Sequence, residues 1–335
     1  MRMLPMSSRF DGLEMRILRV VFSVAGSLAL ASSASAQSYP TKPVQIEVPF
    51  APGAADVFIR AMVPALEAEL GQPIVIENRP GANGAVAAEA VKRAAPDGYT
   101  LLMAPASVLA TRYVIKDANF DVRKDFSAVS SIHESPMLLA VYPGLGIKTV
   151  VELIEHAKRN PGKMSFGSAG IGSVMHLDAE IFKKESNTDI IHVPYKGAAV
   201  FIPDLITGRL DMAFSTLGTL APQITDNKLT ALAVLGKAPL KELPGIPSIN
   251  DTLPNFQKVA TWSTIIAPPG LPDAIRTRLH QATEKVLARE DIRSLFEKNN
   301  GMTFSTKSPD EVSKAICAES EFLEKVTKSI GIQPN

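Results

Sequence analysis

The stretch Gly167-Ser168-Ala169-Gly170-Ile171-Gly172-Ser173-Val174-Met175-His176 lies between a strand-like segment, residues 163–166, and a helix-like segment, residues 177–184. A glycine-rich turn that joins a strand to a helix presents backbone N–H groups at the helix N-terminus, where anions bind. Ser173 is placed to cap this helix, and the hydroxyl groups of Ser168 and Ser173 are further donors. Because the turn contains no Lys or Arg, it predicts a reversibly bound carboxylate; the alternative interpretation is a turn that only caps a helix.

Nucleotide and metal motifs are absent from the sequence. A Walker loop needs Lys and then Ser or Thr after its last glycine, whereas Ser173 and Val174 follow Gly172. The glycine spacing of three and then two is the reverse of the dinucleotide fingerprint. The five histidines show no paired metal-ligand spacing, and Cys317 is the single cysteine. We therefore expect no cofactor, no metal and no intramolecular disulfide.

Residues 1–36 have the features of a cleaved export signal. Basic residues precede an apolar run over 20–30, and Ala34-Ser35-Ala36 offers a small-residue cleavage site. A membrane anchor is the competing interpretation, but the run is shorter than the roughly 20 residues of a spanning helix. Because Met15 begins a compact signal by itself, translation starts either there or at Met1.

Charge and length exclude several classes of partner. Cleavage removes four arginines and two acidic residues, which moves the net charge from +1 to about −1. A nearly neutral chain without a basic run has little electrostatic attraction to nucleic acid or to an anionic membrane. The mature chain is long enough to bury one large or two medium cores without disulfides. We expect a monomer that binds neither nucleic acid nor membrane.

Short apolar strand patterns alternate with helical patterns, which indicates α/β domains with largely parallel sheets. The predicted strands are residues 44–48, 74–77, 101–103, 137–141, 190–193, 212–214 and 229–234. Thr149-x-x-Glu152 and Ser308-Pro309-x-Glu311 have the pattern of a capping box, and each predicts the start of a helix.

Composition changes at Tyr142-Pro143-Gly144 and in the proline-rich stretch 239–254 suggest two crossovers between lobes. The expected first lobe combines residues 40–141 with 259–335, and its last helix is free to pack across both lobes. The second lobe spans residues 142–258. A cleft between two such lobes is a natural ligand site.

Several motifs, in order along nearly the whole mature chain, resemble those of the Bug receptors, the periplasmic substrate-binding proteins of tripartite tricarboxylate transporters. The motifs are Tyr39-Pro40-x-Lys42-Pro43, Val48-Pro49-Phe50-Ala51-Pro52-Gly53 followed by Asp56, Leu70-Gly71-Gln72-Pro73, Glu77-Asn78-Arg79-Pro80-Gly81-Ala82, Ala95-Pro96-Asp97-Gly98-Tyr99-Thr100-Leu101-Leu102, the Gly167–His176 stretch, His192-Val193-Pro194-Tyr195-Lys196-Gly197, Leu205-Ile206-x-Gly208-x-Leu210-Asp211 and Ala267-Pro268-Pro269-Gly270-Leu271-Pro272. Each motif alone is weak, but their order and spacing together are specific.

The resemblance implies a two-lobed α/β receptor, of the periplasmic-binding-protein or Venus flytrap type, that closes on a small carboxylate and delivers it to membrane permease subunits without chemistry on the ligand. One binding loop comes from each lobe. The first comprises Phe50, Gly53, Ala54, Ala55 and Asp56, and the second comprises Ser168, Ala169, Gly170, Gly172, Ser173 and His176. The family usually has a second glycine and one more residue before the aspartate, so the first loop is shorter and stiffer here.

Some of these residues have two interpretations. Asp56 either contacts an amino group of the ligand or caps and fixes its loop, and His176 either bonds the ligand or braces the second loop. Additional candidates follow predicted strands, where loops line the ligand sites of open α/β sheets. These are Ser107, Tyr195, Gly197, Asp204 and Thr216; Asp204 is equally consistent with an ordinary surface carboxylate.

Two other functions compete with transport. One is a ligand-sensing receptor that docks on a signalling partner, which the sequence does not distinguish from a transport receptor. The other is a periplasmic serine hydrolase that uses Ser173 and His176. The sequence has no Gly-x-Ser-x-Gly elbow, and Ser173 is already expected to cap a helix. We therefore predict a protein that is not an enzyme.

Overall fold

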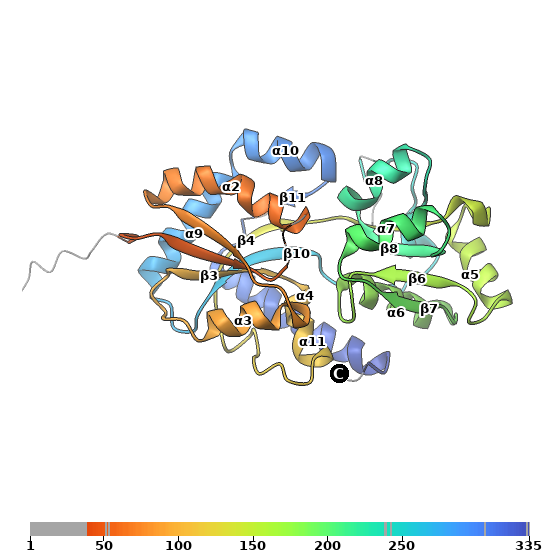
Figure 1. The fold of residues 1–335 in the computed structure, drawn as a ribbon, viewed down its shortest axis with the longest axis horizontal. Helices are drawn as coiled ribbons and strands as arrows, with labels where there is room; N and C mark the ends of the chain where they lie inside the picture. Colours follow the sequence, from red (N-terminus) through yellow and green to blue (C-terminus); the bar gives the residue numbers. More distant parts are fainter. Residues whose placement is uncertain are drawn as a thin grey trace, which may run out of the picture. The chain divides into compact units, whose positions relative to one another are not determined.

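The segments with these alternating patterns form two separate β-sheets (Figure 1). The structure is a computed structural model, and it describes residues 39–50, 52, 54–237, 240–241, 243–304, 306–332 and 334. The predicted export signal lies outside the described residues. The first sheet has the order β11-β4-β10-β3-β1-β2 and the second the order β7-β6-β8-β5-β9. The bounds in the first sheet are β1 Val44–Val48, β2 Ile74–Asn78, β3 Thr100–Pro105, β4 Ser127–Glu134, β10 Trp262–Ala267 and β11 Thr303–Phe304. Those in the second are β5 Met137–Val141, β6 Ser165–Ser168, β7 Ile191–Pro194, β8 Met212–Thr216 and β9 Thr230–Val234.

Both sheets are mixed, so the prediction of largely parallel sheets was wrong in this respect. Strands β1, β2 and β3 pair in parallel, as do β6, β7 and β8. In the first sheet β10 is antiparallel to both β3 and β4, and in the second β5 is antiparallel to both β8 and β9. Strands β5 and β10 each begin just after the chain has crossed from the other sheet. Each runs opposite to the neighbouring strands of the sheet that it joins.

The first crossover lies one strand earlier than the sequence suggested. Residues 137–141, which we assigned to the first lobe, form β5 and pair with β8 and β9 of the second sheet. The chain therefore changes sheets at Ser135 and Pro136. Tyr142-Pro143-Gly144, the predicted crossover, instead leads into the short helix η2 (Pro143–Leu145) after β5.

Helices cover both faces of each sheet. In the first sheet, α2 (Ala54–Leu70) and α9 (Asp273–Leu287) cover one face, and α3 (Ala85–Lys92), α4 (Ser107–Val114) and α11 (Pro309–Ser329) pack on the other. In the second, α5 (Val150–Arg159) and α6 (Val174–Ser186) lie opposite α7 (Ala198–Ile206) and α8 (Leu217–Thr225). The remaining elements are η1 Ala82–Gly84, η3 Ile249–Asp251 and α10 Glu290–Asn300. Helix α10 contacts α2 and α8, and α11 contacts α4 and α6, so both helices touch elements of the two sheets.

Strand β5 shows how the sequence pattern builds these layers. Side chains alternate between the two faces of a strand. Accordingly Leu138 and Ala140 pack in the cluster under α7 and α8, whereas Leu139 and its neighbours Met137 and Val141 pack in the cluster that contains α5 and α6. All five residues are buried, as expected for a strand covered on both faces.

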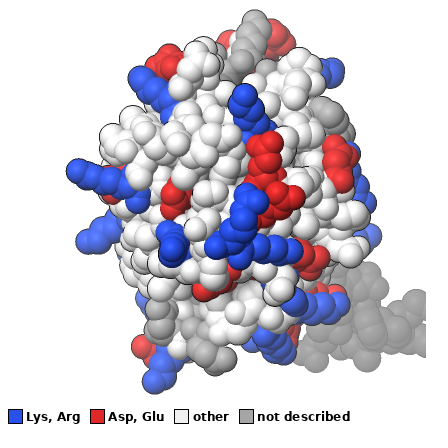
Figure 2. Space-filling view, turned by 90° about the vertical axis from the view of Figure 1, so that its right-hand side faces the viewer, with Lys and Arg blue, Asp and Glu red and all other residues white. Residues whose placement is uncertain are grey.

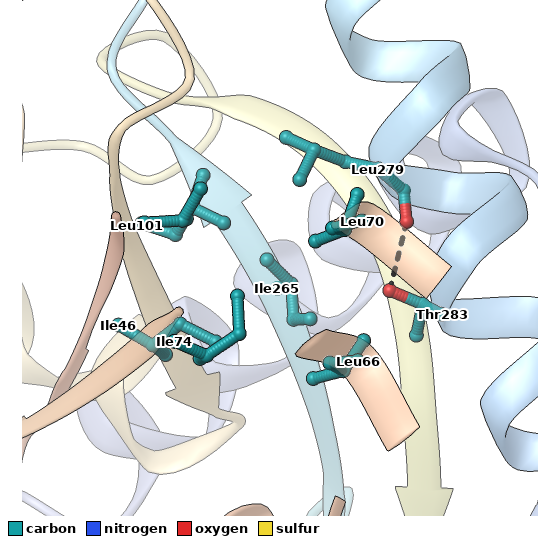
Figure 3. A pocket seen from close by; sticks show the side chains of 9 residues that line it. Ile46, Leu66, Leu70, Ile74, Leu101, Ile265, Leu279 and Thr283 are labelled. Carbon is teal, nitrogen blue, oxygen red and sulfur yellow. Dashed lines mark hydrogen bonds between the residues drawn. The ribbon is translucent and has the colours of Figure 1, made fainter. Parts of the chain in front are cut away.

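A small apolar cavity lies between the first sheet and the helices α2 and α9 (Figure 3). Ile46, Ile74, Leu101 and Ile265 line it from the sheet, and leucines of the two helices close it. Its polar lining residue, Thr283, donates its hydroxyl to the Leu279 carbonyl at 2.9 Å. The cavity therefore offers a ligand no polar group, and it is a packing feature of the core.

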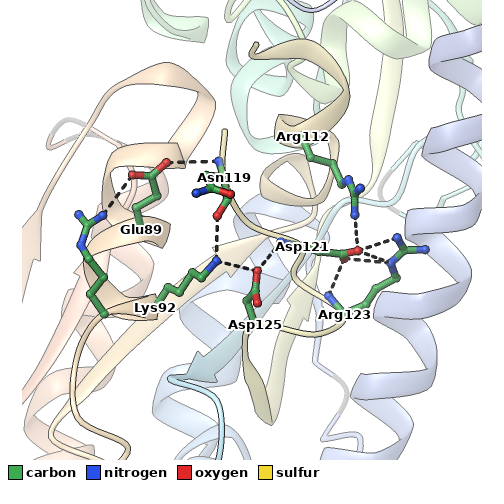
Figure 4. A network of polar contacts seen from close by, with 8 residues as sticks. Glu89, Lys92, Arg112, Asn119, Asp121, Arg123 and Asp125 are labelled. Carbon is green, nitrogen blue, oxygen red and sulfur yellow. Dashed lines mark hydrogen bonds and ion pairs between the residues drawn. The ribbon is translucent and has the colours of Figure 1, made fainter. Parts of the chain in front are cut away.

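A polar network fixes the loop between α4 and β4 (Figure 4). Arg112 and Arg123 both bond the Asp121 carboxylate, and the Lys92 ammonium bonds the Asn119 carbonyl at 2.8 Å and Asp125 at 3.0 Å. Although burial opposes the charged form, the hydrogen bonds from Arg123 and the charge of Arg112 lower the pKa of Asp121 to about 2. The loop is thus held to α3 and α4 by charges that persist through the neutral pH range.

The helix-start predictions are confirmed. The Thr149 hydroxyl accepts the Glu152 N–H at 3.1 Å at the start of α5. Ser308 and Glu311 form a complete capping box at the start of α11, with Pro309 as its first residue. Ser173 caps α6 by accepting the His176 N–H.

Candidate functional site

The predicted site residues lie where parallel strands end and helices begin. In the first sheet, Phe50 follows β1, and Ser107 follows β3 as the first residue of α4. In the second sheet, the 169–173 loop follows β6, Tyr195 follows β7 and Thr216 ends β8. Because the parallel strands of one sheet share their carboxyl edge, each sheet gathers its own set of helix N-termini at one edge.

The second loop uses its hydroxyl groups to hold its own backbone. Ser173 Oγ donates to the Gly170 carbonyl at 2.7 Å and accepts the His176 N–H at 3.3 Å. Ser168 Oγ accepts the Gly170 N–H at 3.1 Å and lies 2.7 Å from His192 Nε2. Both serines are buried. Their hydroxyls therefore brace the loop, and their contact with a ligand stays a prediction.

The stacked imidazole rings of His176 and His192 pack against the second loop and hold it. The His176 and His192 ring centroids are 4.0 Å apart, and the His192 ring lies 4.8 Å from the Phe166 ring. His176 Nδ1 accepts the Gly172 N–H at 3.1 Å, which is the bracing role that we kept open for it. Burial lowers the pKa of His176 to about 3 and that of His192 to about 4, so both rings are neutral at pH 7.

Four N–H groups of the loop stay free of internal partners. Among the described residues, none accepts a hydrogen bond from the backbone N–H of Ala169, Ile171, Val174 or Met175. Val174 and Met175 form the first turn of α6, where N–H groups have no intrahelical acceptor. The helix dipole adds a favourable term of about 0.3–1 kcal/mol for an anion at this end. This arrangement fits a carboxylate bound by neutral donors.

The first loop is anchored by a polar cluster. Asp56 is buried and accepts hydrogen bonds from Arg60 Nε at 2.7 Å and Asn78 Nδ2 at 3.0 Å. Asn78 Nδ2 also donates to the Phe50 carbonyl at 2.9 Å. Asp56 thus fixes the loop to the end of β2, as in the loop-fixing interpretation. Gly53 lies outside the described residues, and the side chains of Ala54 and Ala55 are likewise not described, so the consequence of the shorter loop remains a prediction.

Among the remaining candidates, Tyr195, Asp204 and Thr216 have side-chain partners within the protein. The Tyr195 hydroxyl donates to Asp204 Oδ2 at 2.7 Å, and Arg209 pairs with the same carboxylate, so Asp204 holds the tyrosine. Gly197, with a φ of 127°, is the N-cap of α7. Thr216 Oγ1 lies 2.9 Å from Thr219 Oγ1 at the start of α8. Ser107 is buried, and its carbonyl accepts Asn83 Nδ2 at 3.0 Å.

The second loop also touches an element of the first sheet. A Cβ atom placed on Gly172 would lie 2.5 Å from Val114 Cγ2 of α4. Ser107 begins that same helix. The structure therefore brings the second loop against α4, and only a residue without a side chain fits at that contact.

Residues 58–332 match the family model described as the tripartite tricarboxylate transporter family receptor. The chain belongs to this family. The resemblance to Bug receptors is confirmed by BugT of Bordetella pertussis (strain Tohama I), which is 29% identical over 320 residues that cover 94% of this chain and 98% of BugT.

Solved structures of similar receptors show the same two-lobed fold. Rpa4515 of R. palustris, solved with adipate, is 31% identical with a TM-score of 0.81, and the match covers 89% of this receptor and all of that chain. MatC from Rhodopseudomonas palustris, solved with bound malate, is 26% identical with a TM-score of 0.78 over 86% of this receptor and all of MatC. The predicted fold class is confirmed.

Sequence reasoning missed two residues that support the candidate loops. His192 and Asn78 were quoted within motifs, but neither was proposed as a site residue. His192 is 24 positions from Ser168, and the parallel register that pairs Phe166 with His192 brings the ring under the loop. The sequence did hold a signal for Asn78, because it is a polar residue directly after the predicted strand 74–77.

Three further observations concern the surface charge, the helices and possible metal ligands. Figure 2 shows basic and acidic side chains side by side over the end of the receptor formed by the second sheet and its helices. None of the described helices is both long enough and apolar enough to span a bilayer. Within the same residues, no group of three or more His, Cys, Asp or Glu side chains could hold a metal ion.

Proposed function

We propose that this receptor binds a small carboxylate between its two lobes, after export to the periplasm, and delivers it to the membrane permease subunits of a tripartite tricarboxylate transporter. The observation that carries the proposal is the second loop. Its inner N–H groups are satisfied by Ser168, Ser173 and His176, and its outer N–H groups at the start of α6 are left for an anion.

The relatives support a dicarboxylate in particular. Adipate and malate, the compounds found with Rpa4515 and MatC, each carry two carboxylates. A dicarboxylate matches a site built from helix N-termini of two sheets, because each terminus can receive one negative group. The absence of Lys and Arg from the second loop favours reversible binding, which a delivery protein needs.

The hydrolase alternative lacks its central hydrogen bond. Ser173 donates its proton to the Gly170 carbonyl, and His176 Nδ1 accepts from Gly172, so the two side chains do not form a nucleophile–base pair. Ser168 does bond His192, but its side chain is fully buried. A sensing receptor with the same ligand site is the second candidate function, distinguished from transport only by its partner.

A thermal-shift screen of the mature chain against malate, adipate, citrate and aromatic acids tests binding. A compound present at 100 times its Kd should stabilise the receptor by about 2.7 kcal/mol. Ala169→Asp, which places a carboxylate at the free N–H groups, should abolish that shift, whereas the isosteric neutral Ala169→Asn should retain most of it. An equal shift in both variants would remove this loop from the site, and consumption of the compound would favour an enzyme.

Delivery is tested separately. Uptake of the labelled compound into vesicles that contain the transporter's membrane subunits should require added wild-type receptor. Receptor that binds the compound but gives no uptake would favour the sensing function. Amino-terminal sequencing of the periplasmic protein should find Gln37 first, and light scattering should give the mass of a monomer.

A further inference from the structure

The two segments that cross between the sheets lie side by side. The Ser135 N–H donates to the Thr261 carbonyl at 3.2 Å, and the Thr261 hydroxyl donates to the Ser135 carbonyl at 2.5 Å. Residues 134–136 lead from β4 to β5, and residues 258–261 lead back into β10. Any rotation of one lobe against the other must bend the chain here, so we call residues 134–136 and 258–261 the crossover pair.

Two carboxyl groups from different helices hold the returning segment. Asp178 Oδ1, on α6, accepts the Val259 N–H at 2.7 Å. Glu319 Oε1, on α11, accepts the next N–H, that of Ala260, at 3.0 Å. Asp178 is fully buried, and its second oxygen, Oδ2, has no hydrogen-bond partner among the described residues. A buried polar atom without a partner requires an explanation.

The charges around Asp178 are unbalanced. Among the described residues, Lys258 is the cation whose charge acts on Asp178, but its Nζ is bonded to Glu134 Oε1 at 3.0 Å, and Glu319 adds a further negative charge. Burial, with a smaller contribution from Glu319, raises the pKa of Asp178 to about 7, against the opposing effects of the Val259 N–H and Lys258. Burial also raises the pKa of Glu319. A neutral carboxyl group is much less costly to bury than a carboxylate with an unpaired oxygen.

We propose that Asp178 makes lobe opening depend on its protonation: the neutral acid favours the conformation described here, and the carboxylate favours one in which α6 separates from the crossover pair and water reaches Oδ2. The inference deepens the proposed function, because it rests on the motion of the two lobes that ligand capture requires. Asp178, which is not one of the predicted site residues, would regulate that motion. In this proposal the described conformation, in which the second loop packs against α4, is the one that holds the ligand. Acidic conditions then favour capture, and alkaline conditions favour release.

Small-angle scattering of the ligand-free receptor between pH 5.5 and 8.5 tests the proposal. The radius of gyration should rise with pH, with a midpoint near pH 7, the pKa of Asp178. Asp178→Asn keeps the acceptor oxygen without the charge and should stay compact over the whole range. A wild-type radius that does not change, or an unchanged transition in Asp178→Asn, would overturn the proposal.

Two further variants keep the test decisive if Asp178→Asn does not fold. Lys258→Met removes the cation that favours the carboxylate, so the midpoint should move to higher pH. Glu319→Gln removes a negative neighbour, so the midpoint should move to lower pH. A transition that disappears in Glu319→Gln would assign the switch to Glu319 and contradict the role of Asp178.

Ligand binding gives an independent readout, with adipate as the probe. Its Kd should rise with pH above the midpoint by at most about tenfold per pH unit, the limit for one coupled proton, and Asp178→Asn should flatten this dependence. If adipate and the other screened acids fail to bind, the proposed function fails while the scattering experiment still decides the role of Asp178. If adipate binds with the same pH dependence in both proteins, only the coupling is refuted.

Discussion

Replacement of Gly172 by alanine should destabilise the receptor more than any comparable change at a surface turn. Gly172 has a φ of +78°, and its added Cβ would lie 2.5 Å from Val114 Cγ2 and 3.3 Å from Val114 Cγ1. Gly71, with a φ of +74°, has nothing within 4 Å of its Cβ position and provides the matched control. The two substitutions share the backbone strain and differ in the contact with α4.

The magnitudes follow from these two contributions. The left-handed backbone costs alanine about 1–2 kcal/mol, which is the whole effect expected for Gly71→Ala. Forcing an extra methyl group into a packed site adds about 1–3 kcal/mol, so Gly172→Ala should lose roughly 2–5 kcal/mol in total. Urea unfolding of the mature chain, followed by circular dichroism, measures both values.

A double-mutant cycle isolates the contact. Val114→Ala removes both methyl groups that the new Cβ would meet and leaves only Val114 Cβ, 3.1 Å away, so in that background Gly172→Ala should cost little more than Gly71→Ala. The interaction energy should therefore be about 1–3 kcal/mol, within the range for residues in direct contact. Equal losses for Gly172→Ala and Gly71→Ala in the wild-type background would show that the second loop does not pack against α4.

Three further changes have expected outcomes. Thr149→Ala should lower the unfolding free energy by about 1 kcal/mol, because the helix loses its cap to Glu152, and Thr149→Ser in the same urea titration should restore most of it. Tyr195→Phe should cost about 1–2 kcal/mol, since it leaves Asp204 with one hydrogen bond fewer; an unchanged denaturation midpoint would argue against this bond. Because the pKa of His176 is lowered to about 3 in the folded state, its contribution to stability should be complete above pH 6.5 and decline as the pH falls towards 3. Unfolding titrations at pH 7 and pH 4 should show a smaller acid loss for His176→Asn, and equal losses would exclude this histidine as a cause.

Local sequence patterns identified most elements of the fold but not the direction of all strands. Capping signals and apolar runs are local, and the predicted starts of α5 and α11 agree with the structure. The antiparallel entry of β5 depends on where the chain crosses between sheets, which no short window contains. Strand β4 was missed because it is rich in serine. Its buried Ser131 hydroxyl accepts the Lys307 N–H at 2.7 Å, a partner 176 residues away.

The same difference between local and distant sequence signals explains which features of the candidate site could be predicted. The sequence predicted the second loop as a site, because glycines before a cap are a local signal, and it offered the serine hydroxyls as further donors to the ligand. In the structure Ser168 and Ser173 satisfy the loop itself, and His192 reaches Ser168 from the neighbouring strand. A site made of neutral donors depends on this inner layer. Each N–H–carboxylate bond is worth only about 1.5–3 kcal/mol, and it is worth less if the loop must be ordered on binding. In the proposed function, the buried histidines and serines hold the loop in place before the ligand arrives, so the receptor obtains useful affinity without a buried cation that would slow release.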